Sequence, residues 1–360
     1  MHHGQAIFAG VHARTVVDYA DLRTQPQALG RGGWWAVAAH FDGPWHAWRF
    51  ADIQYNTEHR GAYSAAAAPE GTWHGPDRDS WRSSMSRQEY VHAVQHVRGQ
   101  IEDGRVYQAN ICRVLSAPVL QRPPAVALHH VLAAGNPARY AGVIDVPDGV
   151  RTEGGRPAAA TWVVSASPEL GLAVRAGQVT SGPIKGTAIR PEALGAKDRA
   201  ENLMITDLVR NDLQRVCRPG TVAVTDLLKT ERHPGLVHLV STVRGELRWP
   251  DLAAADGAGW ARVLEAMQPA GSISGAPKAS ALRLIGQLEQ VPRGPYCGQI
   301  GWIDADAQTA RLAVGIRTFW WAKGHLMFGT GAGITYDSDP EREWEETELK
   351  AARLVRLASS

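Results

Sequence analysis

Strand-forming runs occur in hairpin groups along this chain, and helical patterns lie between the groups instead of following every strand. A hairpin is predicted over 170–184, because apolar runs flank a turn near Ala176 and Gly177. The other predicted strands are rich in apolar and β-branched residues, and they cover 106–115, 161–165, 298–303, 311–319 and 325–329. This order is typical of an α+β fold with large antiparallel sheets, and it disfavours a doubly wound parallel sheet.

Helical segments are marked by apolar spacing and by capping residues. Ser86 and Glu89 form a capping-box pattern before apolar residues at helical spacing, and Gly104 ends that pattern. Asp339 followed by Pro340 is a helix start, since aspartate caps helices and proline is tolerated at the first helical position. Further helices are predicted over 123–134, 197–217 and 274–289.

No break in composition separates two independent domains. Residues 1–85 are rich in Trp, Ala and Gly, and short apolar runs within them indicate strands. We therefore expect residues 1–85 to complete the sheets of the same domain as residues 86–360. A chain of 360 residues is long enough to bury one large core in this way.

Charge and cysteine content argue against several classes of function. The chain has 38 Lys and Arg against 36 Asp and Glu, so its net charge of +2 gives no reason to expect nucleic acid or an anionic membrane as partner. The first ten residues do not resemble a secretory signal, and no apolar run approaches the roughly 18–20 residues that span a bilayer, so we expect a cytoplasmic protein. The cysteines at 112, 217 and 297 are far apart and odd in number, which favours reduced, buried thiols over disulfides or a zinc site.

Two predicted helices carry acidic residues three positions apart, which places each pair on one helix face. The pairs are Asp198 with Glu201 and Glu343 with Glu346, and Lys350 lies one turn beyond the second pair. Carboxylates that converge from two helices suit a hard cation such as Mg²⁺. The alternative is a solvated helix face with ion pairs to neighbouring Lys and Arg side chains, and the spacing alone leaves it open.

Lys185 stands at a predicted strand end, between Ile184 and Gly186. A free lysine has a pKa of about 10.4, and desolvation or nearby cations lower that pKa and make the amine nucleophilic. Further along, the glycine-rich segment 329–333 allows backbone N–H groups to approach an anion closely. The alternatives are an ordinary surface lysine and a plain hairpin turn before a helix.

Eight segments together resemble the chorismate-utilising enzymes, and they occur in the order typical of that family. They are SASPE (165–169), GPIKGT (182–187), DRAENLMITDLVRNDLQRVC (198–217), VHLVSTVRGEL (237–247), GSISGAPK (271–278), RGPYCGQIGWI (293–303), GIRTF (315–319) and GTGAGITYDSDPEREWEET (329–347). The family includes anthranilate, aminodeoxychorismate, isochorismate and salicylate synthases. The resemblance implies an anthranilate synthase component I-like fold, in which two large antiparallel sheets pack face to face with helices outside.

Two positions separate the branches of this family. Aminodeoxychorismate synthases resemble this chain in having the lysine of PIKGT, here Lys185, where anthranilate synthases usually have alanine. Isochorismate and salicylate synthases carry a water-activating lysine at the position of Gln108, and glutamine cannot deprotonate water. The resemblance therefore implies amination of chorismate, the step toward p-aminobenzoate and folate. Ammonia is expected from a separate glutamine amidotransferase subunit, because no cysteine here has the setting of a glutaminase nucleophile.

Three other functions remain open at this point. They are an anthranilate synthase large subunit, a related aminating enzyme of secondary metabolism, and a non-catalytic subunit that only binds chorismate.

The resemblance also implies roles for individual residues. Lys185 attacks C2 of chorismate and displaces the C4 hydroxyl, Glu169 protonates that hydroxyl, and His238 orients it. For the metal, Glu201 and Glu346 bind Mg²⁺ directly, while Asp198 and Glu343 bind it through water. The implied substrate-binding residues are Gln108, Thr187, Ser274, Tyr296, Arg317, Gly331, Ala332, Gly333 and Lys350. Among these, Tyr296 and Arg317 hold the enolpyruvyl carboxylate, and residues 331–333 offer backbone N–H groups to a carboxylate.

Overall fold

The fold is built on antiparallel strands that belong to two halves of one hydrogen-bonded sheet. The computed structural model describes residues 3–55, 71–188, 190–233, 236–249, 251–252 and 257–359, without the side chains of Thr187, His233 and Leu236. Every pairing between strands in these ranges is antiparallel. Helices lie between groups of strands in the chain, so the predicted α+β class is confirmed.

The first half, which we call the β3 half, contains a run of strands that pair in the order β12 (Ala223–His233), β13 (Leu236–Glu246), β10 (Gln178–Gly182), β9 (Leu170–Arg175), β16 (Thr309–Val314), β15 (Gln299–Asp304), β3 (Trp34–Ala39), β4 (Trp45–Tyr55) and β2 (Val11–Asp21). A further short strand, β11 (Ile184–Ala188), also pairs with β13.

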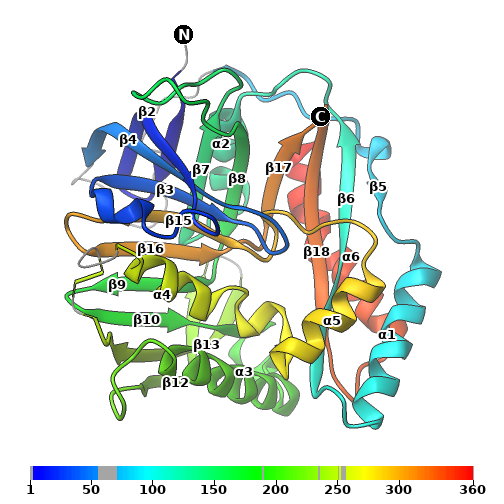
Figure 1. Cartoon of the computed structure of the whole chain (residues 1–360). Helices are drawn as coiled ribbons and strands as arrows, with labels where there is room; N and C mark the ends of the chain where they lie inside the picture. Colours follow the sequence, from blue (N-terminus) through cyan, green and yellow to red (C-terminus); the bar gives the residue numbers. More distant parts are fainter. Residues whose placement is uncertain are drawn as a thin grey trace.

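The second half, which we call the β18 half, pairs in the order β1 (Gln5–Phe8), β7 (Tyr140–Val146), β8 (Thr161–Ser167), β17 (Thr318–Ala322), β18 (His325–Ile334) and β6 (Gln108–Pro118). Two short strands, β5 (Arg82–Ser83) and β14 (Gly275–Ala276), add to β6. Strand β1 pairs with both β2 and β7, so it joins the two halves. The two expected sheets are therefore connected, and Figure 1 shows their strands running in different directions.

The alternation of side chains along β3 shows how the halves pack. Trp34, Ala36 and Ala38 lie in a buried cluster that also contains Ile144 and Val163 of the β18 half. The intervening residues of β3 point the other way, because successive side chains of a strand lie on opposite faces. They join a second buried cluster formed with helices α3 (Ala196–Gln214) and α4 (Gly259–Met267). The halves therefore pack face to face, with helices on the outer face of the β3 half.

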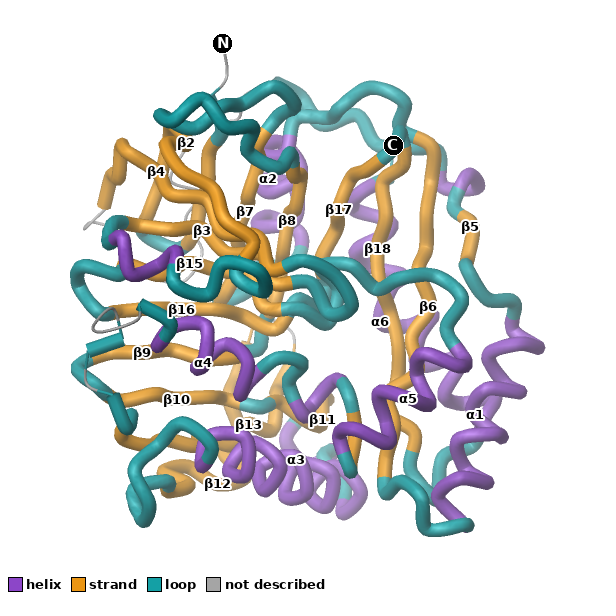
Figure 2. The backbone as a smooth tube through the Cα atoms, viewed as in Figure 1, coloured by secondary structure: helices purple, strands orange, loops and turns teal. Residues whose placement is uncertain are grey.

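Helices also cover the outer face of the β18 half. One cluster contains residues of α2 (Ala125–Gly135) and α6 (Pro340–Ala358), and another contains residues of α1 (Arg87–Glu102) and α5 (Lys278–Leu288). Figure 2 shows α1 and α5 beside the β6 edge, and α3 at the base of the β3 half. The predicted caps are present, since Ser86 and Glu89 bond each other's backbone N–H groups and Asp339 accepts from the N–H of Arg342.

The predicted strand 311–319 is wrong in one respect, because the structure divides it between the two halves. Strand β16 ends at Val314 in the β3 half, and β17 begins at Thr318 in the β18 half. Between them Arg317 has a φ of 52°, a left-handed backbone conformation that breaks a strand. The chain crosses from one half to the other at this point, which places Arg317 between the halves.

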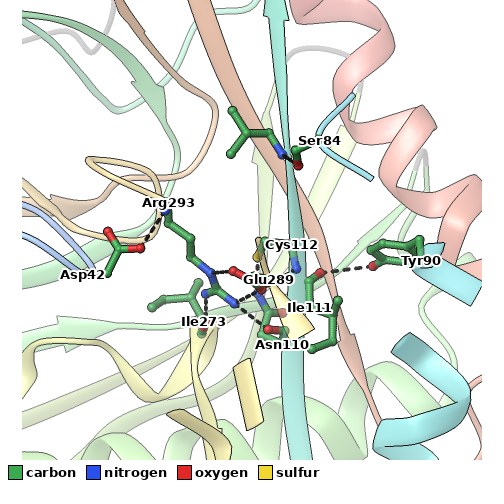
Figure 3. Close-up of polar contacts among 10 residues, drawn as sticks. Asp42, Ser84, Tyr90, Asn110, Ile111, Cys112, Ile273, Glu289 and Arg293 are labelled. Atoms are coloured by element: carbon green, nitrogen blue, oxygen red, sulfur yellow. Dashed lines mark hydrogen bonds and ion pairs between the residues drawn. The ribbon is translucent and has the colours of Figure 1, made fainter. Parts of the chain in front are cut away.

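A buried ion pair ties β6 to the segment before β15 (Figure 3). Both the Nε and the Nη2 of Arg293 donate to the Glu289 carboxylate, at 2.7 and 2.6 Å. The same guanidinium donates to the carbonyl oxygens of Ile273 at 3.0 Å and Asn110 at 2.6 Å, and Glu289 accepts from the N–H of Cys112. A charge this well partnered stabilises its surroundings only while both members are present.

Removing one member of this pair is therefore expected to destabilise the protein strongly. Glu289→Gln leaves the Arg293 guanidinium buried without its counter-charge, and we expect the free energy of unfolding to fall by about 3–5 kcal/mol. Urea denaturation followed by tryptophan fluorescence measures the loss. Glu341→Gln is the control, because the Glu341 side chain is 55% exposed and its pairing with Arg87 contributes little. Equal stability of the two variants would contradict the structural role of the buried pair.

Candidate active site

Glu169 lies at the turn between β8 and β9, and its side chain is buried. The Oγ of Ser272 donates a hydrogen bond to Oε1 of Glu169 at 2.7 Å. Burial raises the pKa of Glu169 to about 7, and this rise is limited by the Ser272 hydrogen bond, by the charge of Lys185 and by the N–H of Ile184. A carboxyl with such a pKa is protonated in a substantial fraction of molecules at neutral pH, as a general acid requires.

Strand β18 presents three glycines on one face, because residues two apart in a strand share a face. A Cβ at Gly329 would lie 2.1 Å from the ring of Tyr296, and one at Gly331 would lie 2.6 Å from Sγ of Cys112. At Gly333 a Cβ would lie 2.5 Å from Nε2 of Gln108. Any larger residue would collide with these groups, so glycine is what allows side chains to lie directly on the strand.

The amine of Lys185 reaches the same face of β18. Its Nζ lies 3.6 Å from the position that a Cβ at Gly333 would take, and Oδ1 of Asn110 lies at the same distance from that position. The side chain is partly buried, and its charge acts on both Glu169 and Glu346. The lysine therefore points toward the interior acids and the glycine face.

The acids of α3 and α6 come together around a lysine. Nζ of Lys197 lies 3.7 Å from Oε1 of Glu201 on its own helix and 3.8 Å from Oε1 of Glu343 on α6. Ser338 donates to Oε1 of Glu343 at 2.6 Å. Lys197 therefore brings the carboxylates of Glu201 and Glu343 to one cation. The resemblance implies that Glu201 and Glu346 bind Mg²⁺ directly and that Glu343 binds it through water.

The other two acids have partners of their own. Oε1 of Glu346 lies 2.5 Å from Nζ of Lys350, which also donates to the carbonyl oxygen of Gly331 at 3.0 Å. Asp198 accepts from the N–H of Gly195 at 2.8 Å and so caps α3. Its Cβ would lie 2.9 Å from a Cβ at Gly186, which keeps Asp198 beside the residue that follows Lys185.

Burial and neighbouring charges shift the pKa values of the two α6 acids, Glu343 and Glu346, in opposite directions. Burial raises the pKa of Glu343, opposed by the Ser338 hydrogen bond and reinforced by the charge of Glu346. Burial also acts to raise the pKa of Glu346, but Lys350, Lys185 and Lys197 together bring it below its usual value. A bound dication would relieve the repulsion between the two carboxylates.

These residues fit a magnesium ion held by few protein ligands. The donors are carboxylate oxygens, and a cationic group already bridges Glu201 and Glu343. The ranges that the structure describes contain no group of three or more His, Cys, Asp or Glu side chains arranged to hold a metal. Mg²⁺ is commonly held by one or two carboxylates, with waters or substrate oxygens completing its shell.

Two of the implied binding residues offer polar groups that have no partner among the residues that the structure describes. Arg317 has no ion pair within the described part of the chain, and burial lowers its pKa. Oε1 of Gln108 is buried and has no hydrogen-bond partner among the described residues. Buried polar atoms of this kind are costly unless a ligand or water satisfies them.

The remaining implied residues differ in the contacts that they make within the protein. Tyr296 is buried, and burial with the neighbouring Cys112 and Cys297 raises its pKa well above the usual value, so its hydroxyl can act as a donor. His238 is buried on β13, in register with Thr187 of β11, whose side chain lies outside the described part. Ser274 donates to the carbonyl oxygen of Ala270 at 2.9 Å, and Ala332 packs in the cluster beneath α1 and α5.

Sequence reasoning missed three polar residues of this region. Ser272 contacts Glu169 from a segment far away in the chain, and no local pattern indicates that contact. Lys197 belongs to the neighbouring Lys and Arg side chains that the sequence offered as ion-pair partners, but the sequence did not indicate that it bridges two helices. Ser338 lies one residue before the predicted helix cap, a position that suggests a turn and not a carboxylate partner.

Comparison with known proteins agrees with this fold and identifies a family. A family model described as chorismate binding enzyme matches residues 37–356, so the chain belongs to the chorismate-binding enzyme family. Aminodeoxychorismate synthase component 1 of Klebsiella aerogenes is 33% identical over 353 residues, which cover 95% of this chain and 72% of that protein. An anthranilate synthase component 1 of Haloarcula marismortui is 36% identical over 291 residues, covering 78% of this chain and 55% of that protein. The chain thus spans little more than half the length of that relative.

Solved structures give the same fold. The anthranilate synthase component I of Streptococcus pneumoniae has a TM-score of 0.70 and 26% identity, with 99% of this chain and 81% of that chain covered. The DhbC protein of Bacillus anthracis, described as a putative isochorismate synthase, has a TM-score of 0.77 and 20% identity, with 99% and 96% covered. No helix in the described ranges is both long enough and apolar enough to cross a membrane.

Proposed function

We propose that this protein aminates chorismate at C4 with ammonia, giving 4-amino-4-deoxychorismate. The observation that carries the proposal is the position of Lys185, whose amine lies beside Gly333 and whose charge acts on Glu169 and Glu346. The similarity to the Klebsiella aminodeoxychorismate synthase supports the same reaction. Ammonia comes from a separate glutamine amidotransferase subunit, and the product is the precursor of p-aminobenzoate.

The reaction divides into two substitutions that exchange a hydroxyl for an amine. Lys185 attacks C2 of chorismate, the ring double bond shifts, and the C4 oxygen leaves with the proton of Glu169 as water. Ammonia then adds at C4, the double bond shifts back, the amine of Lys185 is released from C2 as the neutral amine, and Glu169 recovers its proton from the new C4 ammonium group. The sum consumes ammonia and forms water, and the lysine is regenerated.

Binding groups for the substrate carboxylates are the second part of the proposal. Arg317 and Tyr296 hold the enolpyruvyl carboxylate, because a guanidinium fork and a protonated phenol both donate to it. Glu201 and Glu343, with Glu346 close by, would hold Mg²⁺, and the ion would supply positive charge for the ring carboxylate.

Two substitutions near the proposed metal site are expected to change Mg²⁺ affinity in opposite directions. Glu343→Gln is expected to weaken Mg²⁺ binding by at least about tenfold, since it removes a carboxylate ligand. Lys197→Met is expected to strengthen binding, because the Lys197 ammonium occupies the space between Glu201 and Glu343. Isothermal calorimetry with MgCl₂ measures both changes, and Glu341→Gln on the exposed face of α6 is the matched control. Weaker binding in Lys197→Met would contradict this placement of the ion.

A product assay tests the proposed reaction. The protein is incubated with chorismate, Mg²⁺ and ammonium, and an added aminodeoxychorismate lyase converts the expected product to p-aminobenzoate. Fluorescent anthranilate in place of p-aminobenzoate would establish the second candidate, which the similarity to anthranilate synthases favours. Chorismate binding in calorimetry without turnover from any nitrogen source would indicate a non-catalytic subunit.

A further inference from the structure

The short turn at Gly271–Ile273 is held rigidly by contacts from three directions. A Cβ at Gly271 would lie 3.0 Å from Cβ of Leu208, so the turn packs directly against α3. The carbonyl oxygen of Ile273 accepts from Nη1 of Arg293 at 3.0 Å. On the third side, the N–H of Asn110 donates to the carbonyl oxygen of Ser274 at 2.8 Å. Ser272 therefore has little freedom to move relative to β6 and α3.

The hydroxyl of Ser272 is a hydrogen-bond donor to Glu169. The residue is 4% exposed, and its Oγ donates to Oε1 of Glu169 at 2.7 Å. Glu169 lies in the turn after β8. Its own backbone N–H donates to the hydroxyl of Ser167 at 3.2 Å. The Ser272 bond thus holds the end of the Glu169 side chain, while Ser167 holds its backbone.

We propose that Ser272 is a positioning residue for the proton transfer, in that its hydroxyl fixes the rotation of the Glu169 carboxyl and stabilises the carboxylate left after the proton has gone. This proposal rests on the proposed function of Glu169 as the acid. Because Oε1 accepts from Ser272, the transferable proton resides on Oε2, since the hydroxyl oxygen of a carboxylic acid is the poorer acceptor. When Oε2 gives that proton to the C4 oxygen, the bonding pair remains on the carboxylate, and the Ser272 bond becomes charge-assisted and stronger.

Three groups stabilise the ionised form of Glu169. They are Ser272 from the turn, Lys185 from β11 and the N–H of Ile184. Removing Ser272 takes away one of them, so the pKa of Glu169 must rise further. A hydrogen bond to a charged group corresponds to a shift of about one pH unit or somewhat more.

The test compares Ser272→Ala with Ser272→Thr across pH. In Ser272→Ala we expect kcat to fall by about tenfold or more while KM changes less than about threefold, because the carboxyl loses its fixed orientation and its stabilising donor. The alkaline limb of the kcat profile should move to higher pH by about one unit. Ser272→Thr keeps the hydroxyl and should restore both values to within about threefold of the wild type.

A control and a second readout separate the possible failures. Ser84→Ala removes a hydroxyl that accepts from the N–H of Val114, away from Glu169, and should leave the pH profile unchanged (Figure 3). Infrared titration of protein carrying ¹³C-labelled glutamate follows the Glu169 carboxyl without any reaction, with Glu169→Gln identifying the band. An unchanged titration and pH limb in Ser272→Ala would overturn the role of Ser272. Absence of product from the wild-type protein would instead refute the proposed function.

Discussion

Lys185→Ala is expected to abolish formation of 4-amino-4-deoxychorismate, with kcat falling at least about a thousandfold. The physical reason is that methyl cannot attack C2, so the reaction loses its covalent intermediate and not merely a contact. Chorismate binding should persist, because the proposed carboxylate-binding groups come from the segment between β16 and β17, the segment before β15, and the α3 and α6 acids. Turnover is measured with the lyase-coupled assay, and binding is measured by calorimetry.

Lys229→Ala serves as the matched control for this experiment. Lys229 lies on β12, its side chain is 59% exposed, and its pairing with Asp226 is a surface ion pair. Loss of this lysine should leave kcat within about twofold of the wild type. Undiminished turnover in Lys185→Ala would remove the covalent mechanism, whatever product is formed.

Glu169→Gln is the second large effect, with an expected loss of about 10²–10⁴ in kcat, the range that general acid catalysis contributes. Glutamine has nearly the same shape as glutamate and can still accept from Ser272, but it has no acidic proton to give. In the wild type the acid is active in its protonated form. With a pKa of about 7 for Glu169 in the ligand-free protein, kcat/KM should therefore be highest below that pH and fall as pH rises through it.

The control for Glu169 is Glu246→Gln on β13. The Glu246 side chain is 53% exposed and pairs with Arg218 on the surface, so the substitution should change neither kcat nor its pH profile. In Glu169→Gln the alkaline limb near pH 7 should disappear along with most of the activity. A wild-type kcat/KM that rises through this pH range would show that Glu169 acts as a base, or that another group is the acid.

Local patterns were sufficient to predict the elements that carry the site. The apolar spacing over 197–217 and the helix start at Asp339 and Pro340 predicted the acid-bearing helices that the structure contains as α3 and α6. Gln108 was placed on a strand, and β6 begins there. These predictions succeed because helix periodicity and strand alternation are local properties, and because capping residues mark where a helix begins.

What the sequence could not supply are contacts between distant segments. The bridge from Lys197 to Glu343 depends on how α3 and α6 lie relative to each other, and no periodicity records that. The same is true of Ser272 and Glu169, which are 103 positions apart. The sequence did not indicate the strand break at Arg317, because a run of apolar residues continues on both sides of it. The change in chain direction there depends on the positive φ of this one residue. The helix predicted from Ser274 begins at Lys278, since residues 275–276 pair with β6 first.

The position of α6 in the chain has a consequence for synthesis on the ribosome. Glu343 and Glu346 lie after more than nine-tenths of the 360 residues, yet they face groups on α3 and β11 that are translated much earlier. A nascent polypeptide can build most of the sheet before these acids emerge, but it lacks the proposed Mg²⁺ ligands of α6 until they do. A premature stop codon ahead of residue 343 would therefore yield a fragment without this chemistry, however well its strands have assembled.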